Sequence, residues 1–272
     1  MPSASTWSDR LGRDRTPVVP GHEVSGVVAA LGFGTAGLSV GDEVYGVTDW
    51  YRDGAAAEYV AVEARNLAPK PNSIDHLHAA AVPLAGLTAF QALFDHGRLR
   101  AGRRVLVQGA AGGVGTFAVQ LAHAAGAEVV ATGRAADRDL LASLGADRVV
   151  DVDRQRLEEA AGQVDLVLDL VGGDLAGRSW PLVRPGGALV TVVGGTPAGA
   201  PRAHARWVFF VVEPDRARLA ELGRRVDAGR LRPVVGRVWP LTEGRQAFQA
   251  KRHGGLPGKA VLRVTEEPVR PA

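Results

Sequence analysis

The feature that most constrains the fold of this chain is a glycine-rich segment, GAAGGVG (109–115), between an apolar stretch and a helical one. VLVQG (105–109) before it has the character of a buried strand, and GVGTFAVQLAHAAG (113–126) after it that of a helix. Glycines permit a tight turn and a close backbone approach to a ligand. The free N–H groups and the dipole at a helix N-terminus favour an anion. The pattern predicts a turn that binds the pyrophosphate of a dinucleotide.

Apolar strands alternate with amphipathic segments throughout the middle of the chain. Strands that are apolar on both faces indicate a parallel sheet covered by helices on both sides. The fold class expected is therefore α/β, with a doubly wound parallel Rossmann sheet of six strands and a closing helix at 214–228. The strands expected are 105–109, 128–132, a short one at DRVVD (147–151), 164–171, 187–193 and 207–212.

The flanking parts have a different pattern, with short apolar runs broken by Gly and Asp. These runs, VSGVVAALG (24–32), GDEVYGV (41–47) and AAAEYVAV (55–62), indicate strands of a small β domain. A helical stretch at 74–99 leads into the Rossmann region, and the tail carries two more strands and a helix around 245–252. The tail strands do not continue the β-α alternation, so we expect them to return to the first domain.

The end of the second Rossmann strand bears on the choice of cofactor. NAD-binding folds place an acidic residue there to accept from the ribose 2′-OH. This chain has Thr132-Gly133-Arg134 instead, and a guanidinium suits the 2′-phosphate of NADP(H). Arg134 as one more solvated arginine is the alternative, and Asp137 is better suited to cap the next helix. A methyltransferase, the other class with such a loop, also requires an acid at this strand end.

Composition excludes several functions. The chain has no Cys, which excludes disulfides, thiolate catalysis and Cys-ligated zinc. Its net charge is only +3, and its 29 arginines and three lysines are scattered without interleaved aromatics, so no nucleic-acid partner is expected. No apolar run approaches the ~18 residues of a membrane span and no signal peptide opens the chain, so we expect a cytoplasmic protein without a membrane partner.

Eight segments in order resemble the quinone oxidoreductase branch of the medium-chain dehydrogenase/reductase superfamily. The resemblance implies a GroES-like domain beside the Rossmann domain and a homodimer joined along the last Rossmann strands. It also implies hydride transfer from NADPH to a quinone or another α,β-unsaturated carbonyl, a small-molecule substrate. These segments are PGHEVSGVV (20–28), VGDEVYG (40–46), PLAGLTAFQAL (83–93), VLVQGAAGGVGTFAVQLA (105–122), LGADRVVD (144–151), VDLVLDLVGG (164–173), LVRPGGALVTVVG (182–194) and PGKAVLRV (257–264).

The sequence predicts no metal site. GHE (21–23) resembles the segment that supplies a zinc-binding His in the alcohol dehydrogenase branch, but zinc needs three converging ligands. Leu84 stands where that branch has a Cys. His22 is therefore expected to be a structural hydrogen-bonding residue, and the chemistry is left to the cofactor.

The resemblance begins late, at Pro17, so the GroES-like domain is expected to be partial. The domains predicted are 1–89, completed by 231–272, and a Rossmann domain at 90–230. Two other functions stay open: a relative of the zinc alcohol dehydrogenases, and a cofactor-binding protein without turnover because amino-terminal strands are missing.

Residues that bind NADP(H) are expected around the glycine turn and at the carboxyl ends of the strands. Thr88 is included as a contact to the ring or ribose, although its hydroxyl is equally suited to bond its own helix. No catalytic residue is assigned. The predicted cofactor-binding residues are Thr88, Ala110, Gly112, Gly113, Val114, Gly115, Thr132, Gly133, Arg134, Val171, Gly172, Gly194, Phe210 and Val211.

Overall fold

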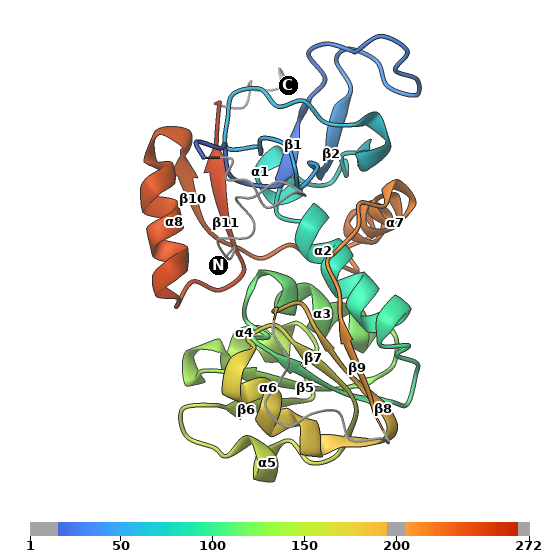
Figure 1. The fold of residues 1–272 in the computed structure, drawn as a ribbon, viewed down its shortest axis with the longest axis vertical. Helices are drawn as coiled ribbons and strands as arrows, with labels where there is room; N and C mark the ends of the chain where they lie inside the picture. Colours follow the sequence, from blue (N-terminus) through green and yellow to red (C-terminus); the bar gives the residue numbers. More distant parts are fainter. Residues whose placement is uncertain (1–15, 195–204, 266–272) are drawn as a thin grey trace. The chain divides into compact units, whose positions relative to one another are not determined.

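The computed structural model describes residues 16–194 and 205–265 (Figure 1). The chain divides into two compact units, neither of which is one continuous segment. Unit 1 comprises Met1–Leu84, Pro214–Gly229 and Val234–Ala272, and unit 2 comprises Ala85–Glu213 and Arg230–Pro233.

Unit 2 contains a six-stranded parallel sheet with the strand order β6-β5-β4-β7-β8-β9. The order reverses direction at β4, which makes the sheet doubly wound, and this confirms the predicted fold class. The central strands are buried on both faces, as their continuous apolar sequence predicted. The strands are β4 (Arg104–Gln108), β5 (Glu128–Gly133), β6 (Arg148–Asp151), β7 (Val164–Asp169), β8 (Val183–Thr191) and β9 (Arg206–Phe209).

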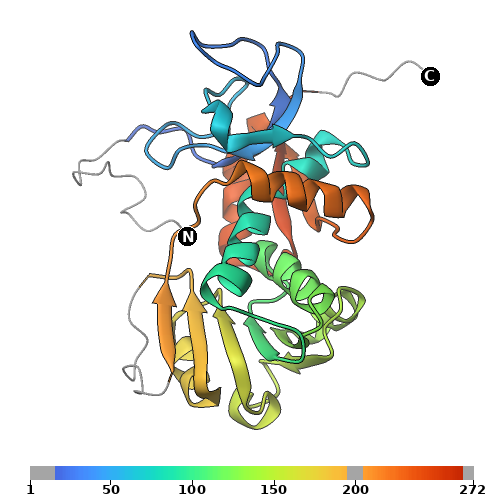
Figure 2. The same cartoon turned by 90° about the vertical axis from the view of Figure 1, so that its right-hand side faces the viewer.

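Helices cover both faces of this sheet (Figure 2). One core cluster packs Trp180, Leu182 and the short helix α5 against strand residues that include Leu106 and Leu189. The helices of unit 2 are α3 (Gly113–Ala124), α4 (Arg138–Ser143), α5 (Leu157–Ala160) and α6 (Gly173–Ser179), with short 3-10 turns η4 (Ala135–Asp137) and η5 (Trp180–Leu182).

Unit 1 contains an antiparallel sheet of three strands in the order β1-β2-β3 and a parallel pair, β10 and β11. This small β domain matches the class of fold expected for the flanking parts. Its elements are β1 (Glu23–Val27), β2 (Glu43–Val47), η2 (Ala64–Asn66), β3 (Leu67–Pro69), α1 (His76–Ala79), α7 (Arg216–Asp227), β10 (Val235–Pro240), η6 (Leu241–Glu243), α8 (Gly244–His253) and β11 (Lys259–Arg263).

One predicted strand of unit 1 is wrong. The stretch at 55–62 forms no strand, and the third strand is β3 instead. Only the start of the stretch is held by backbone bonds, since the Ala55 and Ala56 amides donate to Gly21 and Pro20. Tyr59 is 80% exposed. The alternation of residue types therefore does not reflect a strand with one buried face.

Helix α7 also departs from the predicted domain boundaries, which placed it in the Rossmann domain. It packs within unit 1, where the buried Tyr45 hydroxyl donates to the Leu219 carbonyl over 2.5 Å. Burial raises the pKa of Tyr45 above its ordinary value. At the other end of the helix, the Ser73 amide donates to the Asp227 carboxylate over 2.9 Å. The sequence indicated the helix correctly but not the unit on which it packs.

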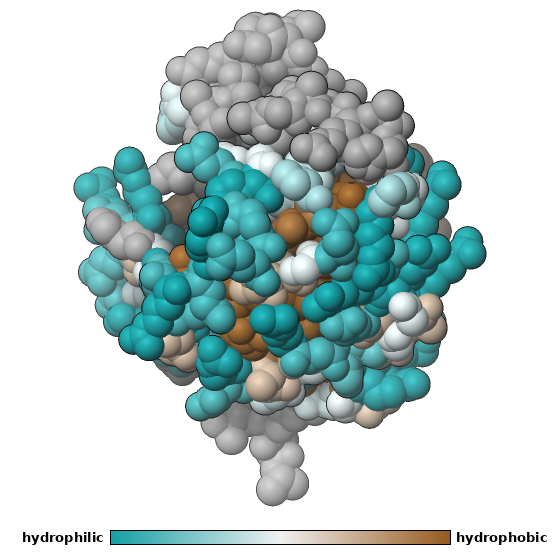
Figure 3. All heavy atoms as spheres, turned by 90° about the horizontal axis from the view of Figure 1, so that it is seen from below, coloured by the Kyte–Doolittle hydropathy of each residue, from teal (hydrophilic) through white to brown (hydrophobic). Residues whose placement is uncertain are grey.

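A helical stretch links the two units, from α1 through α2 (Pro83–Phe90) to η3 (Gln91–His96), a π-helical segment. The stretch His76–His96 is long and apolar enough to cross a membrane, contrary to the sequence expectation, but 72% of it is buried inside the protein. Such burial is typical of a core helix. Viewed from below, most of the visible surface is hydrophilic, with apolar residues confined to small areas (Figure 3).

Candidate dinucleotide site

The glycine turn of unit 2 connects β4 to α3, as the sequence predicted. Gly109 has a φ of +69° and starts the turn, and Gly112 precedes the first residue of the helix. Gly112 is the N-cap residue of α3, and no side chain caps the helix there. The first three N–H groups after the N-cap of any α-helix have no partner within the helix. These are the amides of Gly113, Val114 and Gly115. They lie at the carboxyl edge of the sheet, and an open helix N-terminus of this kind is suited to bind an anion.

Two contacts explain why glycine is needed at this turn. A Cβ on Gly115 would lie 2.4 Å from the Gly109 carbonyl oxygen and 2.5 Å from the Cα of Ala110. Both atoms are backbone and cannot move aside cheaply. The absence of a side chain therefore lets α3 pack directly onto the turn. Ala110 itself is fully buried beneath it.

The end of β5 supports the turn from the side. The Gly109 amide donates to Thr132 Oγ1 over 3.1 Å, and the Ala110 amide donates to the Thr132 carbonyl over 3.2 Å. Thr132 is 2% exposed, so its side chain positions the turn from below. Gly133 follows, and a Cβ there would lie 2.8 Å from Leu141 Cδ1. The structure thus brings together the glycine turn and the Thr132-Gly133 pair at the end of β5.

Arg134 is exposed just beyond β5. Its amide donates over 2.9 Å to the carboxylate of Asp137. Asp137 occupies the N-cap position of α4, as expected, but its side chain makes no cap bond to that helix and accepts from the Arg134 amide instead. The carboxylate is engaged with backbone, while the guanidinium of Arg134 extends from an exposed position.

A buried carboxylate organises the ends of β7 and β8. Asp169 is fully buried, and its Oδ1 accepts from the amides of Val171 and Gly172 over 3.0 and 2.8 Å. Its Oδ2 accepts from Thr191 Oγ1 over 2.8 Å. Thr191 Oγ1 in turn accepts from the Val193 amide over 3.1 Å. Two loops of the carboxyl edge are therefore fastened to a single side chain.

Sequence reasoning missed both Asp169 and Thr191. A signal was present, because Asp169 is a carboxylate that directly follows the apolar run LVL (166–168) and lies shortly before two glycines. Such a residue must find several donors once buried. The predicted residues Val171, Gly172 and Gly194 lie on the loops after these strands, and the Val171 side chain is 51% exposed.

The last predicted residues lie where the chain leaves β9. Phe210 is buried and its ring stacks on His96, with centroids 4.4 Å apart, whereas Val211 is 57% exposed. The strand is shorter than the six residues expected, since it ends at Phe209. Thr88 lies on α2 and is only 5% exposed.

His22, at the zinc-ligand position of the alcohol dehydrogenase branch, lies in unit 1. His22 Nδ1 lies 2.8 Å from Thr48 Oγ1, and its ring packs on Trp50 with centroids 4.6 Å apart. Within residues 16–194 and 205–265, no three His, Cys, Asp or Glu side chains converge in a way that could hold a metal. The residues therefore do not fit a zinc ion.

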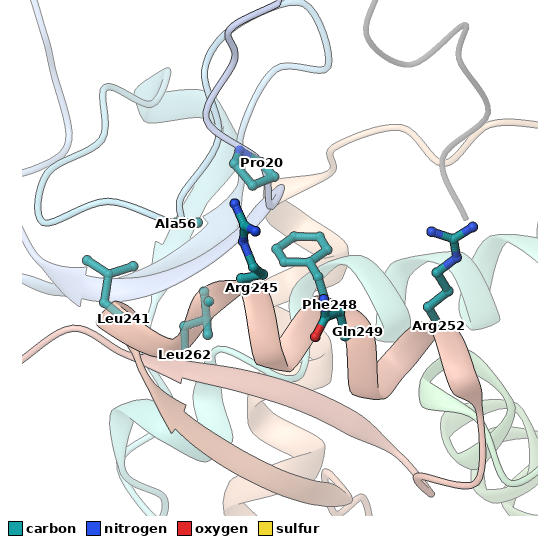
Figure 4. A pocket seen from close by; sticks show the side chains of 9 residues that line it. Pro20, Ala56, Leu241, Arg245, Phe248, Gln249, Arg252 and Leu262 are labelled. Atoms are coloured by element: carbon teal, nitrogen blue, oxygen red, sulfur yellow. The ribbon is translucent and has the colours of Figure 1, made fainter.

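Unit 1 also contains a cavity of about 470 Å³ against helix α8. Arg245 and Phe248 extend from the helix toward Pro20, and Leu241 and Leu262 lie at its base (Figure 4). The cavity shares no residue with the glycine turn. It was not predicted from the sequence.

Comparison with known proteins agrees with this geometry. Residues 4–72 match the family model described as alcohol dehydrogenase GroES-like domain, and residues 144–262 match the one described as zinc-binding dehydrogenase. The quinone oxidoreductase of Coxiella burnetii superposes with a TM-score of 0.86 at 32% identity, over 92% of this chain and 80% of that one. The chain belongs to the medium-chain dehydrogenase/reductase superfamily, in its zinc-free quinone oxidoreductase branch. The family models and the superposition confirm the resemblance that the sequence indicated.

Several similar proteins of this superfamily are named as oxidoreductases or reductases. A zebrafish (Danio rerio) protein, NAD(P)H oxidoreductase RTN4IP1, mitochondrial, is 32% identical over 92% of this chain and 73% of its own length. The 2-methylene-furan-3-one reductase of Solanum lycopersicum is 37% identical over 90% of this chain and 63% of its own. The NADPH-dependent alkenal/one oxidoreductase, chloroplastic, of Arabidopsis thaliana is 35% identical over 90% and 64%. This chain is an NAD(P)H-dependent oxidoreductase of the quinone and alkenal reductase type.

Proposed function

We propose that the chain transfers hydride from NADPH to a quinone or another α,β-unsaturated carbonyl compound without a metal. The observation that carries the proposal is the open N-terminus of α3 behind a turn that only glycine can form, with Arg134 exposed at the next strand end. The names of the Solanum lycopersicum and Arabidopsis relatives, a 2-methylene-furan-3-one reductase and an alkenal/one oxidoreductase, support the substrate class.

The residues fit a dinucleotide. The amides of Gly113, Val114 and Gly115 would bind its pyrophosphate, and Gly115 lets α3 pack against the turn so that these amides lie at the carboxyl edge of the sheet. Asp169 and Thr191 would hold the loops of Val171 and Gly194 in the position where a nicotinamide contacts backbone. When bound, NADPH supplies the hydride, and the protein supplies orientation and exclusion of water.

Arg134 is the basis for proposing NADPH rather than NADH. A guanidinium donates two hydrogen bonds to a phosphate, and Arg134 is exposed at this strand end. Of the nearby acids, Asp137 accepts from the Arg134 amide, and the buried Asp151 on the neighbouring strand accepts from the Asp153 amide. The proposal of NADPH therefore rests on the exposed guanidinium of Arg134.

The test of function is NADPH oxidation with three acceptors of matched size: a quinone, a 2-alkenal and the saturated aldehyde. We expect turnover with the first two and none with the third, because conjugate hydride addition needs the C=C bond. Faster turnover of the saturated aldehyde, or of its alcohol with NADP⁺, would assign the chain to alcohol dehydrogenase chemistry. NADPH binding without any turnover would leave a cofactor-binding protein.

We also propose a homodimer that forms through β9. This strand lies at the edge of the sheet; its last residue, Phe209, is exposed, and so is Val211 just beyond it. A bare apolar edge favours pairing with another strand. Light scattering at micromolar concentration should give twice the mass of one chain, and a monomer would contradict the edge pairing.

A further inference from the structure

Two buried glutamines of unit 2 make the same unusual contact. Gln91 Nε2 donates to the Glu213 carbonyl over 2.8 Å, and the Glu213 amide donates to Gln91 Oε1 over 3.1 Å. Gln120 Nε2 donates to the Arg232 carbonyl over 3.0 Å, and the Arg232 amide donates to Gln120 Oε1 over 2.9 Å. Each primary amide thus pairs with both backbone groups of one residue, as a neighbouring strand would.

The positions of the two contacts coincide with the chain's passages between the units. Glu213 is the last residue of unit 2 before α7, and Arg232 lies in the four-residue return, Arg230–Pro233, after it. Gln91 is 8% exposed and Gln120 is 9% exposed, so water competes little for either pair. The segment 214–229, which contains α7 and belongs to unit 1, is therefore flanked on both sides by residues that glutamine side chains hold in unit 2.

The segment 214–229 is itself held within unit 1 at two positions. Helix α7 is held within unit 1 by the Tyr45 and Ser73 bonds described above. Between these anchors and the two glutamine pairs only a few residues are left, among them Pro214 and Gly229, the latter with a φ of +66°. The residues of segment 214–229 that are free to change backbone conformation therefore lie at its two ends.

We propose that Gln91 and Gln120 are positioning residues that fasten the two connectors of unit 2, and that Gln91 also holds the Phe210–Val211 segment of the dinucleotide site. Gln91 pairs with Glu213, two residues after Val211. Gln120 lies on α3, and its Nε2 also donates to the Thr116 carbonyl of that helix over 2.9 Å, but its partner Arg232 lies on the return segment and not on a loop of the dinucleotide site. The two residues make the same pair of bonds to backbone with different expected consequences, so the two variants can be compared directly. Only the cofactor readout rests on the proposed function.

The experiment measures amide hydrogen exchange and NADPH affinity in the full chain and in the variants Gln91→Leu and Gln120→Leu. Exchange of the Glu213 amide should rise about tenfold in the first variant only, and that of the Arg232 amide about tenfold in the second only. The dissociation constant for NADPH should rise about fivefold in Gln91→Leu and change less than about twofold in Gln120→Leu. Gln163→Leu, which removes one exposed bond to Pro181, is the matched control.

Several outcomes decide the proposal. Unchanged exchange of both amides in the variants overturns it, and equal loss of NADPH affinity in both variants overturns the separate role of Gln91. If Gln91→Leu does not fold, the wild-type chain still tests it, because the Glu213 and Arg232 amides must exchange more slowly than the exposed Arg230 amide. A chain that reduces no quinone or enone would refute the proposed function and leave these exchange results standing.

Discussion

Thr191 Oγ1 donates to Asp169 over 2.8 Å inside the sheet edge, and this bond joins the two strands whose loops face the dinucleotide position. The carboxylate is fully buried and also accepts from two backbone amides. Its charge is therefore balanced by three donors, one of which a single substitution removes.

Thr191→Val should destabilise the fold by about 1–3 kcal/mol, since it leaves a buried carboxylate oxygen and the Val193 amide without their partner. NADPH affinity should fall as well, because the loop loses its anchor. Urea unfolding measures the first effect and fluorescence titration the second. The exposed Thr242→Val is the control. Equal unfolding midpoints for the two variants would show that the bond contributes nothing.

Arg134→Ala should remove the preference for NADPH over NADH, with a loss on the order of 1–3 kcal/mol in NADPH binding and little change for NADH. Titration of both cofactors against both proteins measures it. A native protein that binds the two cofactors equally would contradict the assignment of Arg134 to the 2′-phosphate.

Gly115→Ala should abolish dinucleotide binding at accessible concentrations, because the new Cβ would lie 2.4 Å from the Gly109 oxygen and displace the turn. Gly26→Ala is the matched control, since no atom lies within 4 Å of the corresponding Cβ. Calorimetric titration with NADPH separates the two variants. Tight binding to Gly115→Ala would mean that the turn tolerates a side chain.

Chelators should alter neither NADPH binding nor turnover. Zinc requires three protein ligands, the chain has no Cys, and no ligand set converges in the described residues. Elemental analysis after purification without added metal, followed by assays with and without EDTA, tests this. One zinc bound per chain, with activity lost on its removal, would refute it and make His22 the first ligand to examine.

The ion pair between Glu158 and Arg178 should contribute to stability only above acidic pH. The Arg178 hydrogen bonds lower the pKa of Glu158 to about 2. A carboxyl whose pKa is lowered in the fold stabilises it above its unfolded value near 4.5 and loses that contribution as the pH falls toward 2. Arg178→Met should therefore be about 0.5–1 kcal/mol less stable near neutral pH, a small effect because both side chains are partly exposed. Unfolding midpoints of both proteins should converge near pH 2.

The sequence predicted the parallel sheet and the turn well, because both depend on local patterns. Continuous apolar strands and a glycine run before a helix leave few alternatives. Arg134 followed from the same local logic, since it terminates a recognisable strand. Only the residue types of neighbouring positions were needed for these predictions.

The hydrogen bonds that support the candidate site could not be predicted, because their partners lie far apart in the sequence. The partner of Asp169 lies 22 residues along the chain, and those of Gln91 and Gln120 lie 122 and 112 residues away. No period or motif marks such pairs. The strand predicted at 55–62 failed for a related reason: alternating residue types appeared without a sheet to bury one face. The N-cap position of Asp137 was predicted correctly, but the partner of its carboxylate was not, because that side chain bonds to the preceding turn.

The Tyr45 contact has a consequence for synthesis of the chain. Tyr45 precedes its acceptor, Leu219, by 174 residues, so β2 emerges from the ribosome long before the helix that completes its packing. All six strands of unit 2 precede Phe210, so that sheet can form while α7 is still being translated. The packing of β2 against α7 can therefore be completed only after every strand of the unit 2 sheet has been translated.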